Sequence, residues 1–326
     1  MTVHTLTSEL DRAAEALAGA GHVSLACHEL PDGDALGSML ALMHLCLSQG
    51  KKVTAAWPAP DRVAPHYRWL PGLDQVVPAS EFPGRPPVMV TFDCGSLDRL
   101  GRLGDAAQAA PVLIVIDHHA TAAPFGTINL IDPDAAATAV VVRQLAARLG
   151  WPLTRDAAAC LYTGLVTDTG RFQYSNTTPE TFRLAMELAG FDLPIADINR
   201  ELFEKQTFAL VRLTGRCLAR AELDLDAGMV AAWVTSDELA EAGVEFEETE
   251  GLIDLVRRTA EVDVAVVARQ CEEGVRVSLR SISEMDVGRV AVALGGGGHT
   301  HAAGFVHSGG VAEAIDAVRF TLRQHR

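Results

Sequence analysis

The sequence predicts an α/β protein with an N-terminal parallel-sheet domain flanked by helices, a helical linker, and a smaller C-terminal α/β domain with a mixed sheet. In the first two-thirds of the chain, short apolar runs alternate with amphipathic helical patterns, which is typical of a parallel sheet covered by helices. The last third contains a hairpin pattern instead. At 326 residues the chain is long enough for two domains with separate cores.

The apolar runs of the first two-thirds are the expected strands. Two of them, Val88–Phe92 and Val112–Ile116, are apolar throughout, as in strands buried on both faces. The other expected strands are His22–Cys27, Val53–Trp57 and Thr127–Ile131. Helices are expected at Ala35–Gln49, Ala135–Leu149, Arg155–Leu165 and Pro179–Leu188, the last with Thr178 as cap. The Pro-rich stretch Pro58–Pro87 is expected to be a long surface excursion.

The pattern from Ile195 to Leu223 is helical throughout, with no strand candidate. We therefore expect domains at 1–200 and 224–326, joined by a helical linker at 201–223. In the second domain we expect a strand, a hairpin, a glycine-rich loop and a final helix. The strand is expected at Met229–Val234 and the final helix at Val311–Arg323. The hairpin is expected to pair Val262–Gln270 with Val275–Ser281 and to turn at Glu272-Glu273-Gly274.

Composition limits the functions open to the chain. An apolar content of 48% excludes global disorder. The net charge of −15 argues against binding long duplex nucleic acid, which needs a basic surface, but permits short anions and metal cations. No stretch is long and apolar enough to span a membrane, and the N-terminus lacks a signal-peptide pattern. Six scattered cysteines without a C-x-x-C pair indicate reduced thiols and a cytoplasmic protein.

Acids and histidines gather where the predicted strands end. Ligands of open parallel sheets bind outside the carboxyl ends of the strands, so we expect these side chains to share one crevice. Taken singly, each has another interpretation: Pro-Asp-Gly-Asp as a turn, the aspartate of Asp-His-His as a helix cap, and Asp168 as a helix-terminal turn residue. Together they predict a functional site. They are His28, Asp32, Asp34, Asp93, Asp117, His118, His119 and, after a predicted helix, Asp168.

The ligand chemistry of this set indicates divalent metal. Carboxylates and imidazoles without a thiolate pair favour a borderline-hard ion such as Mn²⁺ over structural zinc. Four carboxylates in one concavity would raise one another's pKa values unless cations intervened, and two divalent ions would balance them. Two ions about 3.5–4 Å apart can stabilise both the attacking and the leaving oxygen in phosphoester hydrolysis.

These residues give the chain a resemblance to the DHH phosphoesterases, within them to the nanoRNase/3′-phosphoadenosine 5′-phosphate phosphatase (NrnA-like) group. The resemblance covers essentially the whole chain, with its motifs in the family's order. The matching motifs are His28-x-x-x-Asp32-Gly-Asp34-Ala-Leu-Gly-Ser, Asp93, Asp117-His118-His119, Gly164-Leu-Val-Thr-Asp168-Thr-Gly, Ser175-Asn-Thr-Thr-Pro-Glu180 and Gly295-Gly-Gly-Gly-His299-x-x-Ala302-Ala-Gly304.

The resemblance implies two Mn²⁺ ions per active site, with Mg²⁺ or Co²⁺ as substitutes. One ion would be held by His28, Asp32 and Asp93. The second would be held by Asp34, Asp93, His118 and Asp168, with Asp93 bridging. The resemblance also implies that Asp117 orients His118 and that His119 faces the scissile phosphate.

A second candidate site lies in the glycine-rich loop. Gly295 to His299 leave backbone N–H groups unshielded and able to cradle an anion, although such a run can also be a flexible turn. Arg280, at the end of the hairpin, can grip a phosphate or stack on a base. The resemblance implies that this domain holds the nucleotide while the N-terminal domain cuts. The candidate substrate-binding residues are Arg280, Ser281, Gly296, Gly297, Gly298 and His299.

The site residues predict a Mn²⁺-dependent phosphoesterase, and the resemblance implies that it acts on very short RNA oligonucleotides and on 3′-phosphoadenosine 5′-phosphate. The resemblance further suggests a homodimer. Alternatives are a phosphodiesterase for cyclic or linear dinucleotides and, from a different class, a catalytically silent nucleotide-sensing module. An inorganic pyrophosphatase would not need the glycine loop, and the net charge of −15 opposes a processive single-strand exonuclease.

Overall fold

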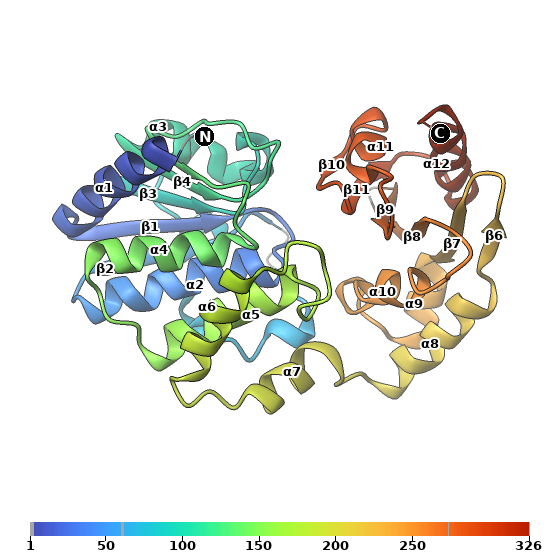
Figure 1. Cartoon of the computed structure of the whole chain (residues 1–326), viewed down its shortest axis with the longest axis horizontal. Coiled ribbons are helices and arrows are strands. Elements are labelled where there is room, and N and C mark those ends of the chain that lie inside the picture. Colours follow the sequence, from blue (N-terminus) through green and yellow to red (C-terminus); the bar gives the residue numbers. More distant parts are fainter. Residues whose placement is uncertain (1–2, 60–61, 273, 326) are drawn as a thin grey trace. The chain divides into compact units, whose positions relative to one another are not determined.

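The computed structural model describes residues 3–59, 62–272 and 274–325. The chain divides into two compact units, Met1–Glu204 and Lys205–Arg326, each built on its own sheet (Figure 1). The first sheet is parallel and the second is mixed, so the predicted fold class is confirmed. Among the described residues no helix has the length and apolar character needed to cross a membrane.

The first unit contains a five-stranded sheet in the order β2-β1-β3-β4-β5, and every neighbouring pair is parallel. Parallel strands need crossover connections, which the helices between them provide. As predicted, the two middle strands of apolar sequence are buried along almost their whole length. The strands are β1 (His22–Cys27), β2 (Lys52–Ala56), β3 (Val88–Phe92), β4 (Val112–Asp117) and β5 (Ile128–Ile131).

Helices cover both faces of this sheet. The larger core lies on the face that carries Leu25, Val90 and Ile114. It is completed by α1 (Val3–Gly19), α2 (Gly33–Ser48), α4 (Thr138–Leu149), α5 (Arg155–Asp168), α6 (Pro179–Ala189) and α7 (Ile195–Phe203). A smaller core on the other face packs Met89 and Val115 against the short elements η4 (Leu97–Leu103) and α3 (Gly104–Ala109).

The Pro-rich stretch is not the surface excursion that its composition predicts. It forms three single 3-10 turns, η1 (Pro65–Tyr67), η2 (Leu73–Gln75) and η3 (Ala79–Glu81). Tyr67 and Phe82 are buried and belong to the two cores of the first unit. Prolines interrupt regular secondary structure, but the apolar residues between them still pack. The segment therefore contributes to the cores on both faces of the sheet. Pro60 and Asp61, within it, lie outside the described residues.

The second unit contains a six-stranded sheet in the order β10-β11-β9-β8-β7-β6, antiparallel except for the pair β7–β8. Its strands are β6 (Glu222–Asp224), β7 (Met229–Val234), β8 (Val264–Cys271), β9 (Gly274–Ser281), β10 (Gly297–Gly298) and β11 (Ala302–His307). One face packs against α11 (Val287–Ala293) and α12 (Val311–His325). The other packs against α8 (Phe208–Ala219), α9 (Ser236–Ala242), η5 (Phe246–Thr249) and α10 (Leu252–Val256).

The region expected to be helical throughout contains a strand. Residues Glu222–Asp224 form β6 and pair antiparallel with Met229–Ala231, so the expectation of no strand before Leu223 was wrong. A three-residue edge strand has no detectable alternation in sequence. Within the expected linker, α8 contributes Leu210, Leu213 and Cys217 to a core of the second unit. The hairpin is present as predicted, although Glu273 of its turn lies outside the described residues.

Candidate functional site

The acidic and histidine side chains of the predicted site lie at the carboxyl ends of three neighbouring strands of the first sheet. His28 directly follows β1, Asp93 follows β3, and Asp117 ends β4, with His118 next in the chain. Because β1, β3 and β4 are adjacent and parallel, their carboxyl ends lie side by side. The predicted convergence of these side chains is therefore present in the structure.

Asp93 is the centre of the cluster. Its Oδ2 lies 3.5 Å from His28 Nε2, while its Oδ1 lies 3.6 Å from His118 Nε2 and 3.5 Å from His119 Nδ1. The residue has φ 54°, a left-handed backbone conformation that is uncommon outside glycine. Such strain persists where surrounding structure enforces it, as it does at functional sites. One buried carboxylate thus lies within reach of three imidazoles.

Two groups of potential metal ligands share Asp93. His28, Asp32 and Asp93 form one, and Asp34, Asp93 and His118 form the other, with ligand atoms within 4.8 Å of one another in each. Asp168, the last residue of α5, places Oδ2 3.4 Å from His118 Nε2. The structure brings all six predicted metal-ligating residues together. Their binding of metal is a prediction to which we return below.

The hydrogen bonds of the cluster fit divalent metal. His28 Nδ1 lies 2.7 Å from the Glu29 carbonyl, and His118 Nδ1 lies 3.2 Å from the Ala135 carbonyl. A ring whose Nδ1–H donates to a carbonyl presents Nε2 as the ligand atom, and both Nε2 atoms face carboxylates. Nitrogen and oxygen donors without thiolate suit Mn²⁺ or a similar ion.

The electrostatics show how strongly the carboxylates interact. Burial raises the pKa of Asp34 well above its usual value, and the charges of Asp93 and Asp168 raise it further. Burial also raises the pKa of Asp168, to about 6. Burial lowers the pKa of His118, but the carboxylates of Asp168, Asp93 and Asp34 outweigh it and raise that pKa to about 10. Without metal, protons therefore supply the counter-charge that cations would otherwise bring.

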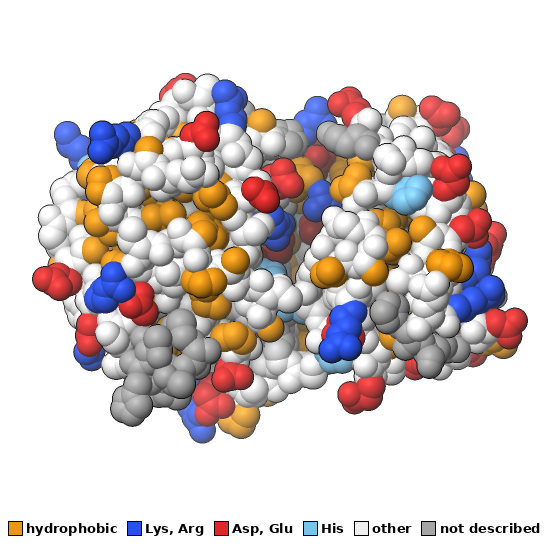
Figure 2. Space-filling model, turned by 90° about the horizontal axis from the view of Figure 1, so that it is seen from above, with side chains coloured by type: hydrophobic (Ala, Val, Ile, Leu, Met, Phe, Trp, Pro, Cys, Tyr) orange, Lys and Arg blue, Asp and Glu red, His pale blue; other side chains and the backbone are white. Residues whose placement is uncertain are grey.

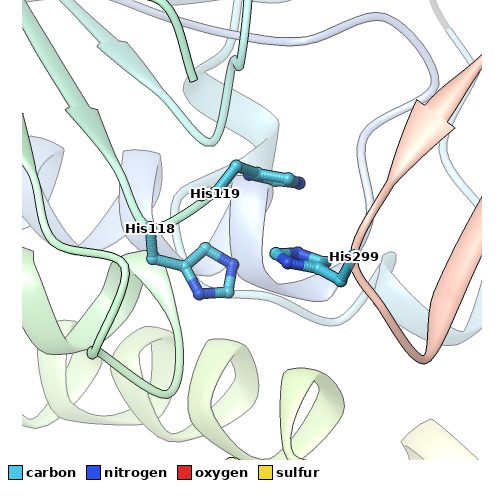
Figure 3. Close-up of side chains that lie close together, drawn as sticks. All are labelled: His118, His119 and His299. Carbon is cyan, nitrogen blue, oxygen red and sulfur yellow. The ribbon is translucent and has the colours of Figure 1, made fainter. Parts of the chain in front are cut away.

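Asp117 contacts a different histidine from the one expected. Its Oδ1 accepts from the backbone N–H of His119 at 2.8 Å and lies 2.7 Å from His119 Nδ1. The expectation that Asp117 orients His118 was therefore wrong, since the Ala135 carbonyl faces His118 Nδ1 instead. Figure 3 shows the rings of His118 and His119, whose planes are tilted at 69° with centroids 5.1 Å apart. Consecutive residues turn in different directions, so only one of them can face Asp117.

Two residues that support the cluster were not predicted. Thr138, the first residue of α4, donates its hydroxyl to Asp93 Oδ1 at 2.9 Å and its backbone N–H to Asp34 Oδ2 at 2.6 Å. Asn176 Nδ2 donates to the backbone carbonyls of Asp168 and Ala136. The sequence hid Thr138 because the helix was expected to start at Ala135, which made the threonine an interior residue. Asn176 belongs to the motif Ser175-Asn-Thr-Thr-Pro-Glu180, but the sequence indicated no role of its own for it.

In the second unit, Arg280 and Ser281 end β9 beside β11. Arg280 pairs with Ala302 across the sheet, and its Nη1 donates to the Leu279 carbonyl at 3.0 Å. Within the part of the chain that the structure describes, the buried Nε of Arg280 has no hydrogen-bond partner. Ser281 donates its backbone N–H to the His301 carbonyl at 3.0 Å. Arg280 is thus fixed at its backbone but has an unused donor.

The glycine-rich loop is a structured element. A Cβ on Gly296 would lie 2.1 Å from the Gly304 carbonyl oxygen, and one on Gly298 would lie 2.5 Å from the Ala302 oxygen, so the loop needs glycine there. The N–H groups of Gly295 and Gly296 donate to the end of α11, and that of His299 donates to Ala302. The expectation of an unshielded N–H cradle along the whole run was therefore wrong. Gly297–Gly298 pair with β11 as β10.

Family models match most of both units. The DHH family N-terminal domain matches residues 22–165, and the DHHA1 domain matches residues 226–324. The first match contains His28, Asp93 and His118, and the second contains Arg280 and the glycine-rich loop.

Relatives match along most of the chain. A bifunctional oligoribonuclease and PAP phosphatase NrnA of Thermus thermophilus is 35% identical over 92% of this chain and 86% of its own length. The Bacillus subtilis protein of that name is 26% identical over 85% of this chain and 86% of its own.

Solved structures share the fold. An exopolyphosphatase-related protein from Bacteroides fragilis superimposes with a TM-score of 0.90 and 26% identity, covering 100% of this chain and 98% of the other. RecJ from Thermus thermophilus in complex with Mn²⁺ has a TM-score of 0.55 and 14% identity, covering 100% of this chain and 55% of RecJ.

Proposed function

We propose, from the premise that this chain belongs to the DHH family of phosphoesterases, that it degrades very short RNA oligonucleotides to mononucleotides and dephosphorylates 3′-phosphoadenosine 5′-phosphate to AMP. As a member of that family it is a metal-dependent hydrolase of phosphoester bonds. The substrates are those that the names of its NrnA relatives state, and the inference to this chain rests on similarity over most of both lengths.

The observation that carries the proposal is the cluster around Asp93. We propose that His28, Asp32 and Asp93 hold one Mn²⁺ and that Asp34, Asp93, His118 and Asp168 hold a second. The distances of 3.4–3.6 Å between imidazole nitrogens and carboxylate oxygens are those of donors arranged around a shared position. When bound, the ions would neutralise phosphoryl oxygens and supply a nucleophile at neutral pH. Mg²⁺ or Co²⁺ would be the substitutes.

His119 is the proposed catalytic donor of this chain. Burial lowers its pKa, but the carboxylates of Asp93 and Asp117 outweigh burial and raise it. With Nδ1 held by Asp117, Nε2 can donate to a phosphoryl oxygen on which charge develops. Asp117 acts as a positioning residue, because its Oδ1 fixes both the backbone and the ring of His119.

The second unit supplies the proposed nucleotide-binding residues: Arg280, Ser281, Gly296, Gly297, Gly298 and His299. Acidic and basic side chains are interspersed on the face seen in Figure 2, and the net charge of −15 disfavours long polyanions, which supports a short substrate. The six cysteines are free thiols, five of them buried, which supports a cytoplasmic protein. A homodimer is the proposed assembly, to be checked by sedimentation equilibrium.

A substrate panel tests this function. Purified protein with Mn²⁺ is incubated side by side with a diribonucleotide, 3′-phosphoadenosine 5′-phosphate, a cyclic dinucleotide and pyrophosphate, and products are resolved by ion-exchange chromatography. The proposal expects mononucleotide from the first and AMP plus phosphate from the second. Faster cleavage of the cyclic dinucleotide would favour the alternative phosphodiesterase. Nucleotide binding without any turnover would favour a sensing module.

A further inference from the structure

Helix α6, which packs against α5, exposes apolar side chains on its outer side (Figure 1). Leu184 and Leu188 bury the inner side of the helix in the larger core. Phe182 and Met186, one helical turn apart on the outer side, are 55% and 73% exposed. Of the large apolar side chains that the described part of the first unit exposes, only Leu47 lies elsewhere. The helix thus carries a second apolar surface, which we call the α6 strip (Phe182 and Met186).

Phe182 is held rigidly within this strip. Its ring stacks on that of Phe172, with the ring centroids 5.5 Å apart and the planes at 29°. Phe172 in turn packs against the larger core. A side chain that is already ordered pays little further conformational entropy when a partner covers it. Phenylalanine and methionine are also enriched at the centres of protein–protein interfaces.

Charged side chains of both signs line one edge of the α6 strip. Helical spacing places Glu180, Arg183 and Glu187 on the same side of the helix. Arg183 forms an ion pair with Glu180, and Glu187 forms one with Arg143 of α4 at 2.6 Å. The opposite charges along this edge balance. A nucleic acid, which needs a basic surface, therefore does not match it.

A balanced edge of this kind matches a second copy of itself. Two copies related by a two-fold axis present the same surface to each other. An antiparallel pair of α6 helices, with the axis passing midway between Phe182 and Met186, sets Phe182 of each copy against Met186 of the other. The charged edges then meet on the same side of the contact, and Arg183 of each copy lies near Glu187 of the other.

The exposed apolar side of α8 has a different charge pattern. Phe208 and Val211 are 76% and 50% exposed, but α8 contains no acidic residue. Glu241 of α9 balances Arg216, which leaves Arg212 as an uncompensated charge beside the apolar pair among the described residues. Two copies of this surface would bring like charges together. The charges therefore favour α6 over α8 for self-association.

We propose that two copies of this chain associate through the α6 strip, with their α6 helices antiparallel. This inference deepens the proposed function, because it gives the proposed homodimer a contact surface, and it rests on that assembly. Burial of Phe182 and Met186 supplies the apolar centre of the contact. The pairing of Arg183 with Glu187 across the two-fold axis fixes the direction of the helices.

Sedimentation equilibrium of the full chain over a wide range of protein concentration measures the dissociation constant of the dimer. We expect a dimeric wild-type protein and, for Met186→Glu, a dissociation constant at least about tenfold higher, because the contact would bury a carboxylate. The matched control is Phe208→Glu on α8, which places the same charge at a similarly exposed apolar position and should leave the constant unchanged. Circular dichroism melting checks that both variants fold, and Met186→Lys replaces Met186→Glu if the latter does not.

A charge reversal tests the direction of the helices. Arg183→Glu should weaken association, because it sets carboxylates of the two copies near each other. Combining it with Glu187→Arg restores opposite charges across the two-fold axis and should recover most of the lost affinity. A double variant that associates as weakly as Arg183→Glu alone would overturn the antiparallel contact.

Three other results would overturn the inference. A monomeric wild-type protein would overturn it together with the proposed homodimer. A dimer that persists unchanged in folded Met186→Glu would overturn the inference and leave the homodimer standing. Weaker calorimetric binding of a diribonucleotide in EDTA by Met186→Glu, with unchanged association, would instead make the α6 strip an RNA contact. Because none of these measurements involves turnover, their failure is distinct from absence of product in the substrate panel.

Discussion

The hydroxyl of Thr138 donates a 2.9 Å hydrogen bond to Oδ1 of Asp93, the carboxylate that both potential metal-ligand groups share. Thr138 is fully buried and begins α4, so its position is fixed by the helix. Its backbone N–H binds Asp34 at the same time. The start of one helix therefore orients two carboxylates from different elements, Asp93 in the loop after β3 and Asp34 in the first turn of α2.

Thr138→Val should weaken metal binding while preserving the fold. The substitution keeps the side-chain shape but removes the donor to Asp93, and loss of such a supporting hydrogen bond typically costs about 10–100-fold in metal affinity. Calorimetric titration of the metal-free protein with Mn²⁺ measures it. Thr138→Ser should retain most of the affinity. The matched control is Thr163→Val, which removes a buried hydroxyl bonded only within α5. Equal loss in both valine variants would contradict the positioning role.

Metal binding should release protons and tighten as pH rises. The pKa of His118 is raised to about 10, so at neutral pH its imidazole carries the proton that a metal ion must displace. The pKa of Asp168, raised to about 6, acts in the same direction below that pH, and the raised pKa of Asp34 adds to the effect. Mn²⁺ titrations at pH 7 in buffers of different ionisation enthalpy give the number of protons released. A heat that does not depend on the buffer would refute this expectation.

Removing metal should destabilise the first unit. A ligand at a hundred times its dissociation constant stabilises by about 2.7 kcal/mol, which for a unit of this size corresponds to roughly 5–10 °C in melting temperature. Tryptophan fluorescence can follow the thermal unfolding of the first unit, since Trp57, Trp69 and Trp151 belong to that unit. The shift between Mn²⁺ and EDTA should vanish in Asp93→Asn. It should persist in Asp105→Ala, which removes an exposed carboxylate on α3.

Gly296→Ala should damage the second unit, whereas Gly297→Ala should be tolerated. A Cβ at position 296 would meet backbone oxygen at 2.1 Å, while at position 297 nothing lies within 4 Å. Because the backbone of β11 cannot move away without disrupting the sheet, we expect the free energy of unfolding of Gly296→Ala to be lower by at least about 1–3 kcal/mol. Urea denaturation compares the two. If Gly297→Ala were equally destabilised, the strain would not come from the contact with β11.

The site residues of the first unit were predictable because parallel strands carry their following loops to one edge. His28, Asp93 and His118 each follow an apolar run that the sequence marks clearly. Thr138 was not predictable, since its contact with Asp93 depends on where α4 starts, and sequence patterns locate helix ends poorly. The hydrogen bonding of Asp117 to His119 was not predicted, because it depends on the backbone conformation after β4, which sets the direction of each histidine ring.

In the second unit, β6 escaped detection because a three-residue edge strand has no period. The cross-strand pair of Arg269 and Arg276 could not be predicted for a different reason. Arg269 and Arg276 meet only through the hairpin register, which fixes the cross-strand partners, and burial of Arg269 depends on η5 packing over it. Register and packing of this kind are set by tertiary structure and leave no signal in spacing along the chain.

The central claim is that the cluster around Asp93 hydrolyses short RNA with metal. The most direct measurement is release of mononucleotide from a diribonucleotide by wild-type protein, Asp93→Asn and Asp105→Ala, each with Mn²⁺ and with EDTA. The account predicts product only with metal, from the wild type and Asp105→Ala, and at least about a hundredfold less from folded Asp93→Asn. Undiminished product from Asp93→Asn, or no product from the metal-loaded wild type, would contradict it.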